Sequence, residues 1–309
     1  MTFNQGFEYS EKVDSRAAGQ GILDYLSRRY RHSTEDEWRD RLDEGLVLLD
    51  GSRISAHTLL RAGQMLVWHR PPWDEPDVPL CYAILFRDRT LLAVAKPNGL
   101  PTLPAGGFLQ HTLLALVQSS YPQATPLHRL GRGTSGIVLF ARTTHARKVL
   151  HRAFRQNEIM KVYRALVVGH PKQDTFTIDV PIGPMPHPGL GRVHAACATG
   201  RQADSHVKVL DRGEEHSLLE VKIATGRPHQ IRIHLAAAGH PLIGDPLYTS
   251  GGVFKQGEPA LPGATGYFLH AHKLSLQHPT NGRPLEITCF PPPELRINSY
   301  KDVGSRKQV

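Results

Sequence analysis

The chain has 309 residues, of which 40% are hydrophobic and 21% are charged, so it is long enough to form one large domain and a smaller one with buried cores. Its formal net charge of +9 favours a polyanionic partner, because Lys and Arg side chains that neutralise phosphates release counterions. A protein that is basic for some unrelated reason is the alternative.

Several classes of protein are excluded by the composition. The three cysteines, Cys81, Cys197 and Cys289, are widely separated, which predicts neither a disulfide framework nor a zinc site and fits a reducing cytoplasm. The 18 histidines are scattered without a metal-binding motif, so no metal is expected. The N-terminus lacks the apolar core of a signal peptide and no run of eighteen apolar residues occurs, so we expect neither secretion nor a membrane span.

The N-terminal part predicts a small helical segment. Residues 1–19 are polar and predict a flexible leader. From Ile22, the sequence ILDYLSRRY places apolar residues at helical spacing beside arginines, which predicts a short basic helix. Ser33 and Thr34 precede an acidic turn, which predicts the N-cap of a second helix that ends at Gly45.

Short strands complete this part of the chain. VLLDGSRIS predicts a strand, an Asp-Gly turn and a second strand, and residues 62–68 predict another. Two small helices joined to a β-hairpin over residues 20–70 resemble the S-four-type RNA-binding domain, a fold named for a ribosomal protein; an unrelated small α+β module is the alternative. Residues 71–80 are proline-rich and acidic, which predicts a linker.

The stretch HRLGRGTSG, residues 128–136, predicts a polar loop at the edge of a core. His128 and Arg129 are adjacent donors of the kind that hold phosphate, and the glycines permit unusual backbone angles. Residues 137–141 follow as an apolar, β-branched run, which predicts a buried strand. Sites are commonly built on such loops, although an ordinary surface turn is the alternative for this segment alone.

The remaining sequence predicts an alternation of helices and strands. The predicted helices cover 111–119, 146–154 with a basic outer face, and a segment that starts at Pro228 and ends at Gly239. The predicted strands are KVYRALVVG, 176–182, a hairpin of 205–210 with 217–223, and two last strands in LHAHKLSLQHP and LEITCFPPP. Residues 183–200 predict a loop, and residues 296–309 predict a basic tail.

Several segments resemble, in order and spacing, the motifs of the RluA-type pseudouridine synthases. They are AVAKPNGLPTLPAG, HRLGRGTSGIVLFA, KVYRALVVG and GRPHQIRIHLAAAGHPLIGDPLY, followed by FLHAHKLSLQHP. The resemblance covers residues 81–295. It implies an α+β catalytic-type domain with a mixed, largely antiparallel sheet and a central RNA-binding cleft, beside the small N-terminal α+β RNA-binding domain. It also implies isomerisation of uridine in ribosomal or transfer RNA, without cofactor or metal.

The resemblance assigns expected roles to individual residues. Enzymes of this family break the bond between uracil N1 and the ribose, turn the base and rejoin it through C5. A carboxylate in a segment that reads HRLD acts at the sugar as nucleophile or base, and an arginine holds it ionised. By resemblance, Tyr163 stacks on the uracil and assists the late proton transfer, and Arg232 is the arginine. The residues expected to bind RNA are His128, Arg129, Arg132, Thr134, Ser135, His229, Gln230 and Leu269.

This sequence departs from the family pattern at one position. Gly131 occupies the place of the catalytic aspartate, and no carboxylate lies elsewhere in residues 126–157. Glycine can neither attack the sugar nor take a proton. Arg232 is then expected to lack its usual partner unless another acid, RNA phosphate or solvent compensates. Asp245 in GDPLY is the nearest acid within a motif, and a structural role in the turn after Gly244 is the preferred interpretation.

Three hypotheses follow from this departure. The first is an RNA uridine isomerase in which another group replaces the aspartate, and the second is an RNA-binding protein that keeps the cleft without the chemistry. The third is that Gly131 is a substitution in an active parent; the GRG pair of glycines favours a natural loop with its own backbone requirement. We favour the first hypothesis, for a cytoplasmic monomer that binds RNA.

Overall fold

A computed structural model of the chain describes residues 4–30, 32–187, 190–255 and 263–297. The chain divides into two compact units, residues 1–75 and 76–309, and the division lies within the range predicted as a linker. Most of the predicted C-terminal tail lies outside the described residues. Every helix in the described part of the chain is too short or too polar to span a lipid bilayer.

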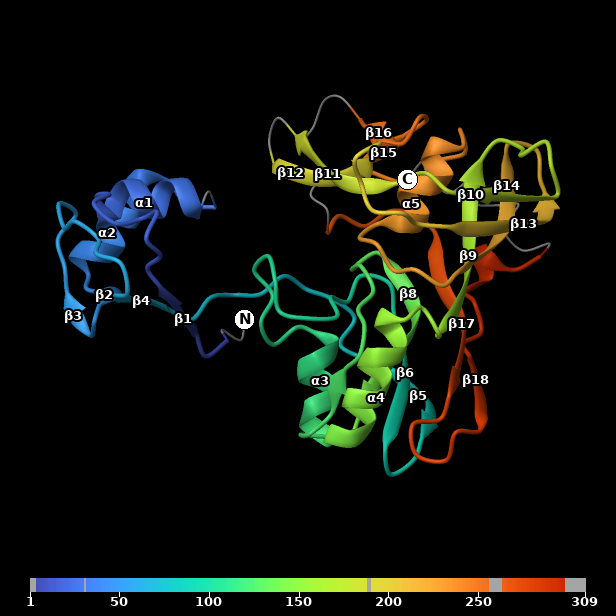
Figure 1. The fold of residues 1–309 in the computed structure, drawn as a ribbon, viewed down its shortest axis with the longest axis horizontal. Coiled ribbons are helices and arrows are strands. Elements are labelled where there is room, and N and C mark those ends of the chain that lie inside the picture. The colour runs from blue at the N-terminus through green and yellow to red at the C-terminus, as the bar shows by residue number, and fades with distance from the viewer. Residues whose placement is uncertain (1–3, 31, 188–189, 256–262, 298–309) are drawn as a thin grey trace. The chain divides into compact units, whose positions relative to one another are not determined.

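The first unit combines a four-stranded sheet with two helices (Figure 1). The sheet has the order β1 (Phe7–Lys12), β4 (Met65–Arg70), β2 (Val47–Leu49) and β3 (Ser52–Arg53), and the helices are α1 (Ile22–Arg29) and α2 (Glu35–Asp43). Thr34 begins α2 with a capping box, since its hydroxyl accepts from the Glu37 amide while the Glu37 carboxylate accepts from the Thr34 amide.

The prediction of a flexible leader over residues 1–19 is wrong. Strand β1 lies in this range and pairs antiparallel with β4, where the ring of Tyr9 stacks on that of Trp68 at a centroid distance of 5.1 Å. Val13 and Ala17 are buried in the core of this unit. The short sequence FEYSEK alternates aromatic and polar side chains, a weak strand signal that becomes decisive only when β4 supplies the partner.

The second unit is built on a ten-stranded sheet with the main order β10-β13-β14-β9-β17-β8-β6-β5. The bounds of its strands are β5 (Ala83–Arg87), β6 (Leu91–Lys96), β7 (Thr125–Pro126), β8 (Thr134–Ala141), β9 (Met160–Val168), β10 (Thr175–Ile178), β13 (Ser205–Arg212), β14 (His216–Ile223), β17 (Leu269–Gln277) and β18 (Pro284–Thr288). Strand β17 runs parallel to β8 and antiparallel to β9. The prediction of a mixed, largely antiparallel sheet is therefore confirmed.

Helices and two small hairpins complete this unit (Figure 1). They are α3 (Leu113–Ser120), α4 (Thr144–Arg155), α5 (Gln230–Ala237), the 3-10 turn Pro293–Leu295, and the strand pairs β11 (Ile182–His187) with β12 (Gly191–Ala196) and β15 (Tyr248–Thr249) with β16 (Val253–Phe254). Both faces of the sheet are buried, because alternate residues of β6 enter two different cores. Leu92 and Val94 pack with α3, whereas Leu91 and Ala93 pack with α4.

Three local predictions need correction. Within the range 183–200 that was predicted as a loop, residues 183–187 of β11 pair with residues 191–195 of β12, because the backbone pairs despite its glycines and prolines. The strand predicted over 176–182 is divided, since β10 ends at Ile178 and β11 begins at Ile182. Helix α5 begins at Gln230, because His229 before it adopts a left-handed conformation with φ of 55°.

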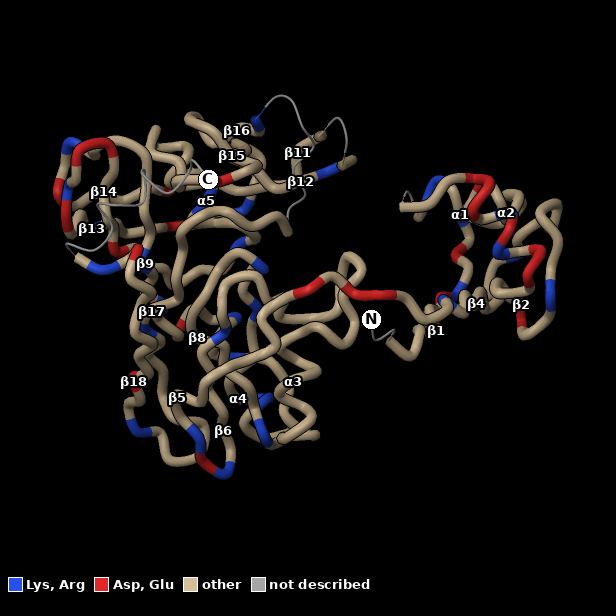
Figure 2. The backbone as a smooth tube through the Cα atoms, turned by 180° about the vertical axis from the view of Figure 1, so that it is seen from behind, with Lys and Arg blue, Asp and Glu red and all other residues tan. Residues whose placement is uncertain are grey.

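The charges of the two units differ in sign. Residues 1–75 carry 13 acidic and 10 basic side chains, whereas residues 76–309 carry 15 acidic and 27 basic ones. Figure 2 marks these charges along the backbone, including the acids near the division of the chain. The positive excess that favours a polyanion therefore belongs entirely to the second unit.

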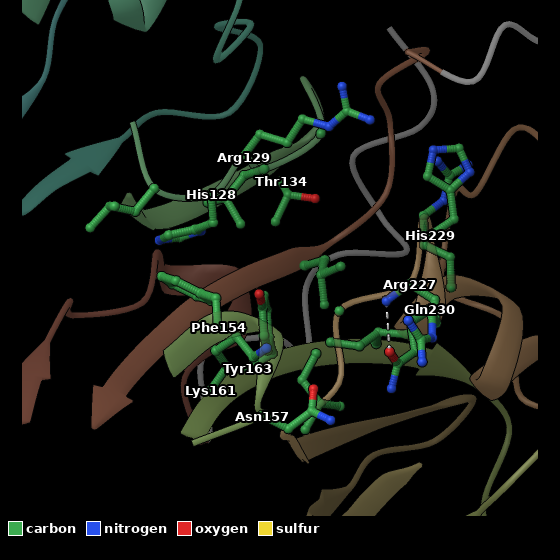
Figure 3. A pocket seen from close by; sticks show the side chains of 18 of the residues that line it. His128, Arg129, Thr134, Phe154, Asn157, Lys161, Tyr163, Arg227, His229 and Gln230 are labelled. Carbon is green, nitrogen blue, oxygen red and sulfur yellow. Dashed lines mark hydrogen bonds between the residues drawn. The ribbon is translucent and has the colours of Figure 1, made fainter. Parts of the chain in front are cut away.

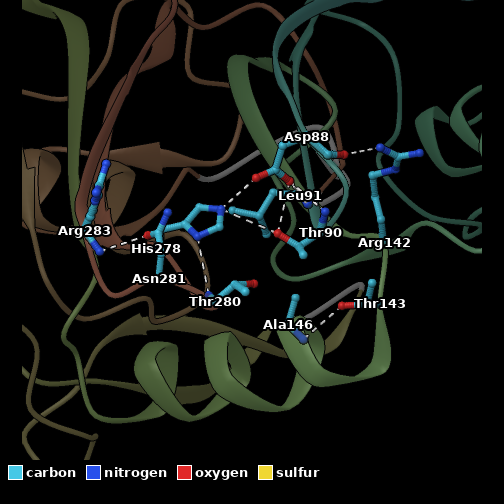
Figure 4. Close-up of polar contacts among 10 residues, drawn as sticks. All are labelled: Asp88, Thr90, Leu91, Arg142, Thr143, Ala146, His278, Thr280, Asn281 and Arg283. Atoms are coloured by element: carbon cyan, nitrogen blue, oxygen red, sulfur yellow. Dashed lines mark hydrogen bonds and ion pairs between the residues drawn. The ribbon is translucent and has the colours of Figure 1, made fainter.

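A carboxylate joins two turns at one end of the large sheet (Figure 4). Asp88, in the β5–β6 turn, accepts from the amides of Thr90 and Leu91 at 2.7 Å and from His278 Nε2 at 2.7 Å. Arg142 Nη1 donates to the Asp88 carbonyl. Partial burial disfavours the charged carboxylate, but these hydrogen bonds outweigh it and lower the pKa of Asp88 below 3.8.

We expect Asp88→Ala to lower the free energy of unfolding by about 1–3 kcal/mol at pH 7, because it leaves buried donors without an acceptor. Asp88→Asn keeps one acceptor oxygen and should lose less. Since the folded-state pKa of Asp88 is depressed, its contribution is present above pH 3.8 and is lost as the pH falls through that lower folded value. Urea unfolding followed by circular dichroism between pH 3 and 7 measures this, and equal losses in the two variants at pH 7 would contradict it.

Candidate active site

A pocket of about 720 Å³ opens where several elements of the second unit converge (Figure 3). Its wall comes from the loop before β8, the end of α4, strands β9 and β14, the loop that leads into α5, and the start of β17. Within the described residues, no group of three or more His, Cys, Asp and Glu side chains is placed to hold a metal ion.

Most residues predicted for the site lie together in this pocket. Those that line it are His128, Arg129, Gly131, Thr134, Tyr163, His229, Gln230, Arg232 and Leu269. Arg132 and Ser135 are not among its lining residues. Arg132 Nε donates to the carbonyl of Gly263, and the Ser135 hydroxyl contacts His270 Nδ1 at 2.9 Å.

Other residues that line the pocket were not predicted from the sequence. They are His151, Phe154, Arg155, Asn157, Lys161, Arg201, Arg227, Ile223 and Tyr267, with a few others. Lys161 could have been predicted to line the pocket, because it lies two residues before Tyr163 on the same strand and therefore on the same face. Phe154 and Arg155 end a helix with a predicted basic face. No sequence pattern predicts Tyr267 as a lining residue, because only the folded chain brings it close to the loop before β8.

Strand β9 supplies two side chains of opposite character to the pocket (Figure 3). Burial raises the pKa of Tyr163 to about 12, so its hydroxyl stays protonated and can donate. Burial lowers the pKa of Lys161 to about 8, and its Nζ donates to the carbonyls of Ala224 at 2.7 Å and Thr225 at 3.0 Å. Lys161 thereby anchors the loop that leads into α5.

The start of α5 is fixed by polar contacts. Gln230 Oε1 accepts from the Arg227 amide at 3.0 Å and from the Thr225 hydroxyl at 2.9 Å. His229 Nδ1 lies 2.8 Å from the Tyr248 hydroxyl, and burial lowers the pKa of His229 to about 3, so the ring is neutral. The loop therefore presents a neutral imidazole and the Arg227 side chain in a defined position (Figure 3).

Arg232 pairs with Asp245, so another acid compensates for the missing usual partner, one of the alternatives that the sequence leaves open. Its Nε and Nη2 each donate to a carboxylate oxygen of Asp245 at 2.7 Å, and the two side chains are 3% and 2% exposed. Asp245 also accepts from the amides of Leu247 and Tyr248. Burial disfavours both charges, but the paired hydrogen bonds raise the pKa of Arg232 and lower that of Asp245. Both oxygens of Asp245 are occupied, which favours the structural interpretation of this acid.

Among the residues that the structure describes, no carboxylate lines the pocket. A Cβ placed on Gly131 would lie 3.0 Å from the Tyr267 hydroxyl, and one on Gly133 would lie 2.9 Å from Tyr267 Cε1. Neither glycine has a positive φ, so the predicted backbone requirement of the GRG segment is wrong. Gly133 is instead needed for space, because the ring of Tyr267 packs against it, and Gly131 leaves room for the Tyr267 hydroxyl.

Comparison with known proteins identifies this arrangement. A model described as RNA pseudouridylate synthase matches residues 90–237. An uncharacterized RNA pseudouridine synthase of Synechocystis sp. is 44% identical over 92% of this chain and 98% of its own length. The chain belongs to the RNA pseudouridylate synthase family. This confirms the family resemblance and the isomerase class that it implies.

Further relatives agree with this family. RNA pseudouridine synthase 5 of Oryza sativa subsp. japonica is 37% identical over 93% of this chain and 87% of its own length. Ribosomal large subunit pseudouridine synthase D of Xanthomonas campestris pv. campestris is 32% identical over 92% and 89%. The structure of human RNA Pseudouridylate Synthase Domain Containing 1 has a TM-score of 0.57 and 26% identity, covering 72% of this chain and 89% of that one. The fold is therefore shared as well.

We expect Arg232→Ala and Asp245→Ala each to lower the free energy of unfolding by about 3–5 kcal/mol, because each leaves a buried charge without its partner. The double substitution Arg232→Met with Asp245→Leu should recover much of this loss. Urea unfolding of the second unit, followed by circular dichroism, measures all three variants. Full stability of Asp245→Ala together with loss of pseudouridine formation would contradict the structural role and make Asp245 an acting acid.

Proposed function

We propose that this protein isomerises uridine to pseudouridine in structured ribosomal or transfer RNA, and that the uridine enters the pocket around Tyr163. The observation that supports this is the convergence of Tyr163, Arg232 and the 128–134 loop in one pocket of a pseudouridine synthase fold. A base inside a helix is out of reach of such a pocket. The target nucleotide must therefore leave its stack before it binds.

The rim of the pocket suits an RNA backbone. Four arginines contribute to it, Arg129, Arg155, Arg201 and Arg227, and the first three are exposed. In the described part of the chain, no ion pair to Asp or Glu involves these four side chains. Their positive charge is therefore available for RNA phosphates.

The floor of the pocket suits a uracil ring. Tyr163 is 8% exposed and offers a ring for stacking together with a protonated hydroxyl. Arg232 lines the same pocket, and its guanidinium carbon is 4.4 Å from the ring centroid of Tyr267. We propose that Tyr163 holds the uracil and assists the late proton transfer. Localisation in the cytoplasm, a monomeric state, and action without cofactor or metal remain predictions.

A second candidate function is RNA binding without isomerisation. It is favoured by the lining of the pocket, in which the described residues contribute no carboxylate, at Gly131 or at any other position. The same arginines and the same tyrosine would then hold an extruded uridine, and the protein would act through binding alone. The two functions differ only in whether pseudouridine forms.

We expect the purified protein to form pseudouridine in RNA from a strain that lacks its gene, and carbodiimide mapping of that RNA locates the site. Tyr163→Phe keeps the stacking ring but removes the hydroxyl, so it should slow the reaction by about 100-fold or more. RNA affinity should change little in this variant. If the wild-type protein adds no pseudouridine to RNA that it binds, the isomerase proposal fails and the second candidate stands.

We expect RNA affinity to fall steeply with salt, because each arginine–phosphate contact contributes about 0.7–0.9 to the slope of log K against log salt concentration. Arg155→Ala and Arg201→Ala should each reduce the magnitude of this slope by the contribution of about one arginine–phosphate contact. Arg283→Ala, at an exposed turn that does not line the pocket, is the matched control and should leave the slope unchanged. Fluorescence anisotropy at several salt concentrations measures the slope, and an affinity that is independent of salt would contradict a phosphate-dominated interface.

A further inference from the structure

We infer that Tyr267 is the catalytic residue that acts at the ribose in place of the carboxylate missing at position 131. This inference rests on the proposed isomerisation. Tyr267 lines the same pocket as Tyr163 and Gly131, yet it comes from the segment just before β17. It brings a hydroxyl oxygen to the part of the pocket where the sequence has lost its acid.

The position of this oxygen is the first support. A Cβ built on Gly131 would lie 3.0 Å from the Tyr267 hydroxyl oxygen. An aspartate extends two bonds beyond its Cβ, so the carboxylate oxygens of an aspartate at this position would reach the space that the hydroxyl occupies. The tyrosine oxygen and the missing carboxylate therefore belong to the same region of the pocket.

The loop is shaped around this ring, which is the second support. A side chain at Gly133 would meet Tyr267 Cε1 at 2.9 Å and Cζ at 3.0 Å, and one at Gly131 would meet the hydroxyl. Contacts below 3.0 Å do not occur for real Cβ atoms, so glycine at 133 is a condition for this placement of the ring. The GRG sequence and Tyr267 are consequently two parts of one arrangement.

The surroundings of the hydroxyl suit a nucleophile. Its oxygen lies 3.2 Å from the Thr134 hydroxyl, which holds its direction. The guanidinium carbon of Arg232 is 4.4 Å from the ring centroid, and Asp245 holds that guanidinium through two hydrogen bonds. A cation near the ring stabilises the negative charge that develops on the phenol oxygen as its proton leaves.

Other groups in the pocket are less suited to this step. Asp245 has both oxygens occupied and does not line the pocket. His128 Nε2 accepts from the Leu139 amide, and burial lowers the pKa of His128 to about 3. Lys161 donates to two carbonyls. Among the described residues that line the pocket, Tyr267 is therefore the oxygen nucleophile best placed beside the arginine.

The reaction balances with this residue. Tyr267 Oη forms a bond to ribose C1′ while the C1′–N1 bond breaks and its electron pair goes to uracil N1, which receives the phenol proton. After the base turns, C5 bonds to C1′ and the bond between C1′ and Oη breaks, returning its electron pair to the tyrosine oxygen. The proton lost from C5 restores the phenol. The net change is a hydrogen gained at N1 and lost at C5, which is pseudouridine. Tyrosine nucleophiles at an anomeric carbon are known from sialidases.

The test exchanges the two oxygens. Tyr267→Phe should lose at least about 100-fold in the rate of pseudouridine formation, while RNA affinity and thermal stability stay near those of the wild type. The double variant Gly131→Asp with Tyr267→Phe should recover activity, because phenylalanine vacates the space next to the new Cβ. Wild-type activity retained in Tyr267→Phe overturns the inference, as does a folded, RNA-binding double variant without recovery. An inactive wild-type protein would instead defeat the proposed function itself.

Discussion

The buried ion pair between Arg232 and Asp245 is the interaction on which the pocket depends. Two hydrogen bonds of 2.7 Å join side chains that are almost completely buried, and the amides of Leu247 and Tyr248 complete the shell of the carboxylate. The pair ties α5 to the segment that precedes β15. It also holds the guanidinium carbon 5.0 Å from the ring centroid of Tyr248 and 4.4 Å from that of Tyr267.

This pair changes the meaning of Gly131. An arginine that has lost its partner would be a costly buried charge, and a pocket with such a defect would be expected to lose its shape. Asp245 removes that cost without entering the pocket. The charged side chain of Arg232 therefore keeps a partner without a carboxylate at position 131, and Tyr267 occupies the space beside that position. Retention of Tyr163, Arg232 and the arginine rim around this change is the physical basis for the proposed isomerase.

Much of the second unit can be predicted from the sequence, because the patterns that mark its helices, strands and loops each lie within a single segment. The polar loop before β8, the strand that carries Tyr163 and the helix that carries Arg232 each have a period or a motif that marks them. The continuous apolar run along β6 likewise marks a buried strand. The features that could not be predicted depend on contacts between distant segments or on a particular turn. The sequence of β1 is too weak a strand signal by itself, and the strand forms because β4 pairs with it. The partner of Arg232 depends on the turn that positions Asp245. The packing of Tyr267 on two glycines joins segments far apart in the chain, and no spacing rule reveals it.

A crystal structure of the protein bound to RNA that carries an unreactive analogue of the target uridine would test the role of Tyr267 most directly. If Tyr267 acts at the ribose, the uracil stacks on Tyr163 and Tyr267 Oη lies about 3–3.5 Å from ribose C1′, on the face opposite the base, as expected for a near-attack arrangement. A bound uridine with C1′ turned away from Tyr267, or with a carboxylate brought to C1′ from elsewhere in the chain, would contradict it.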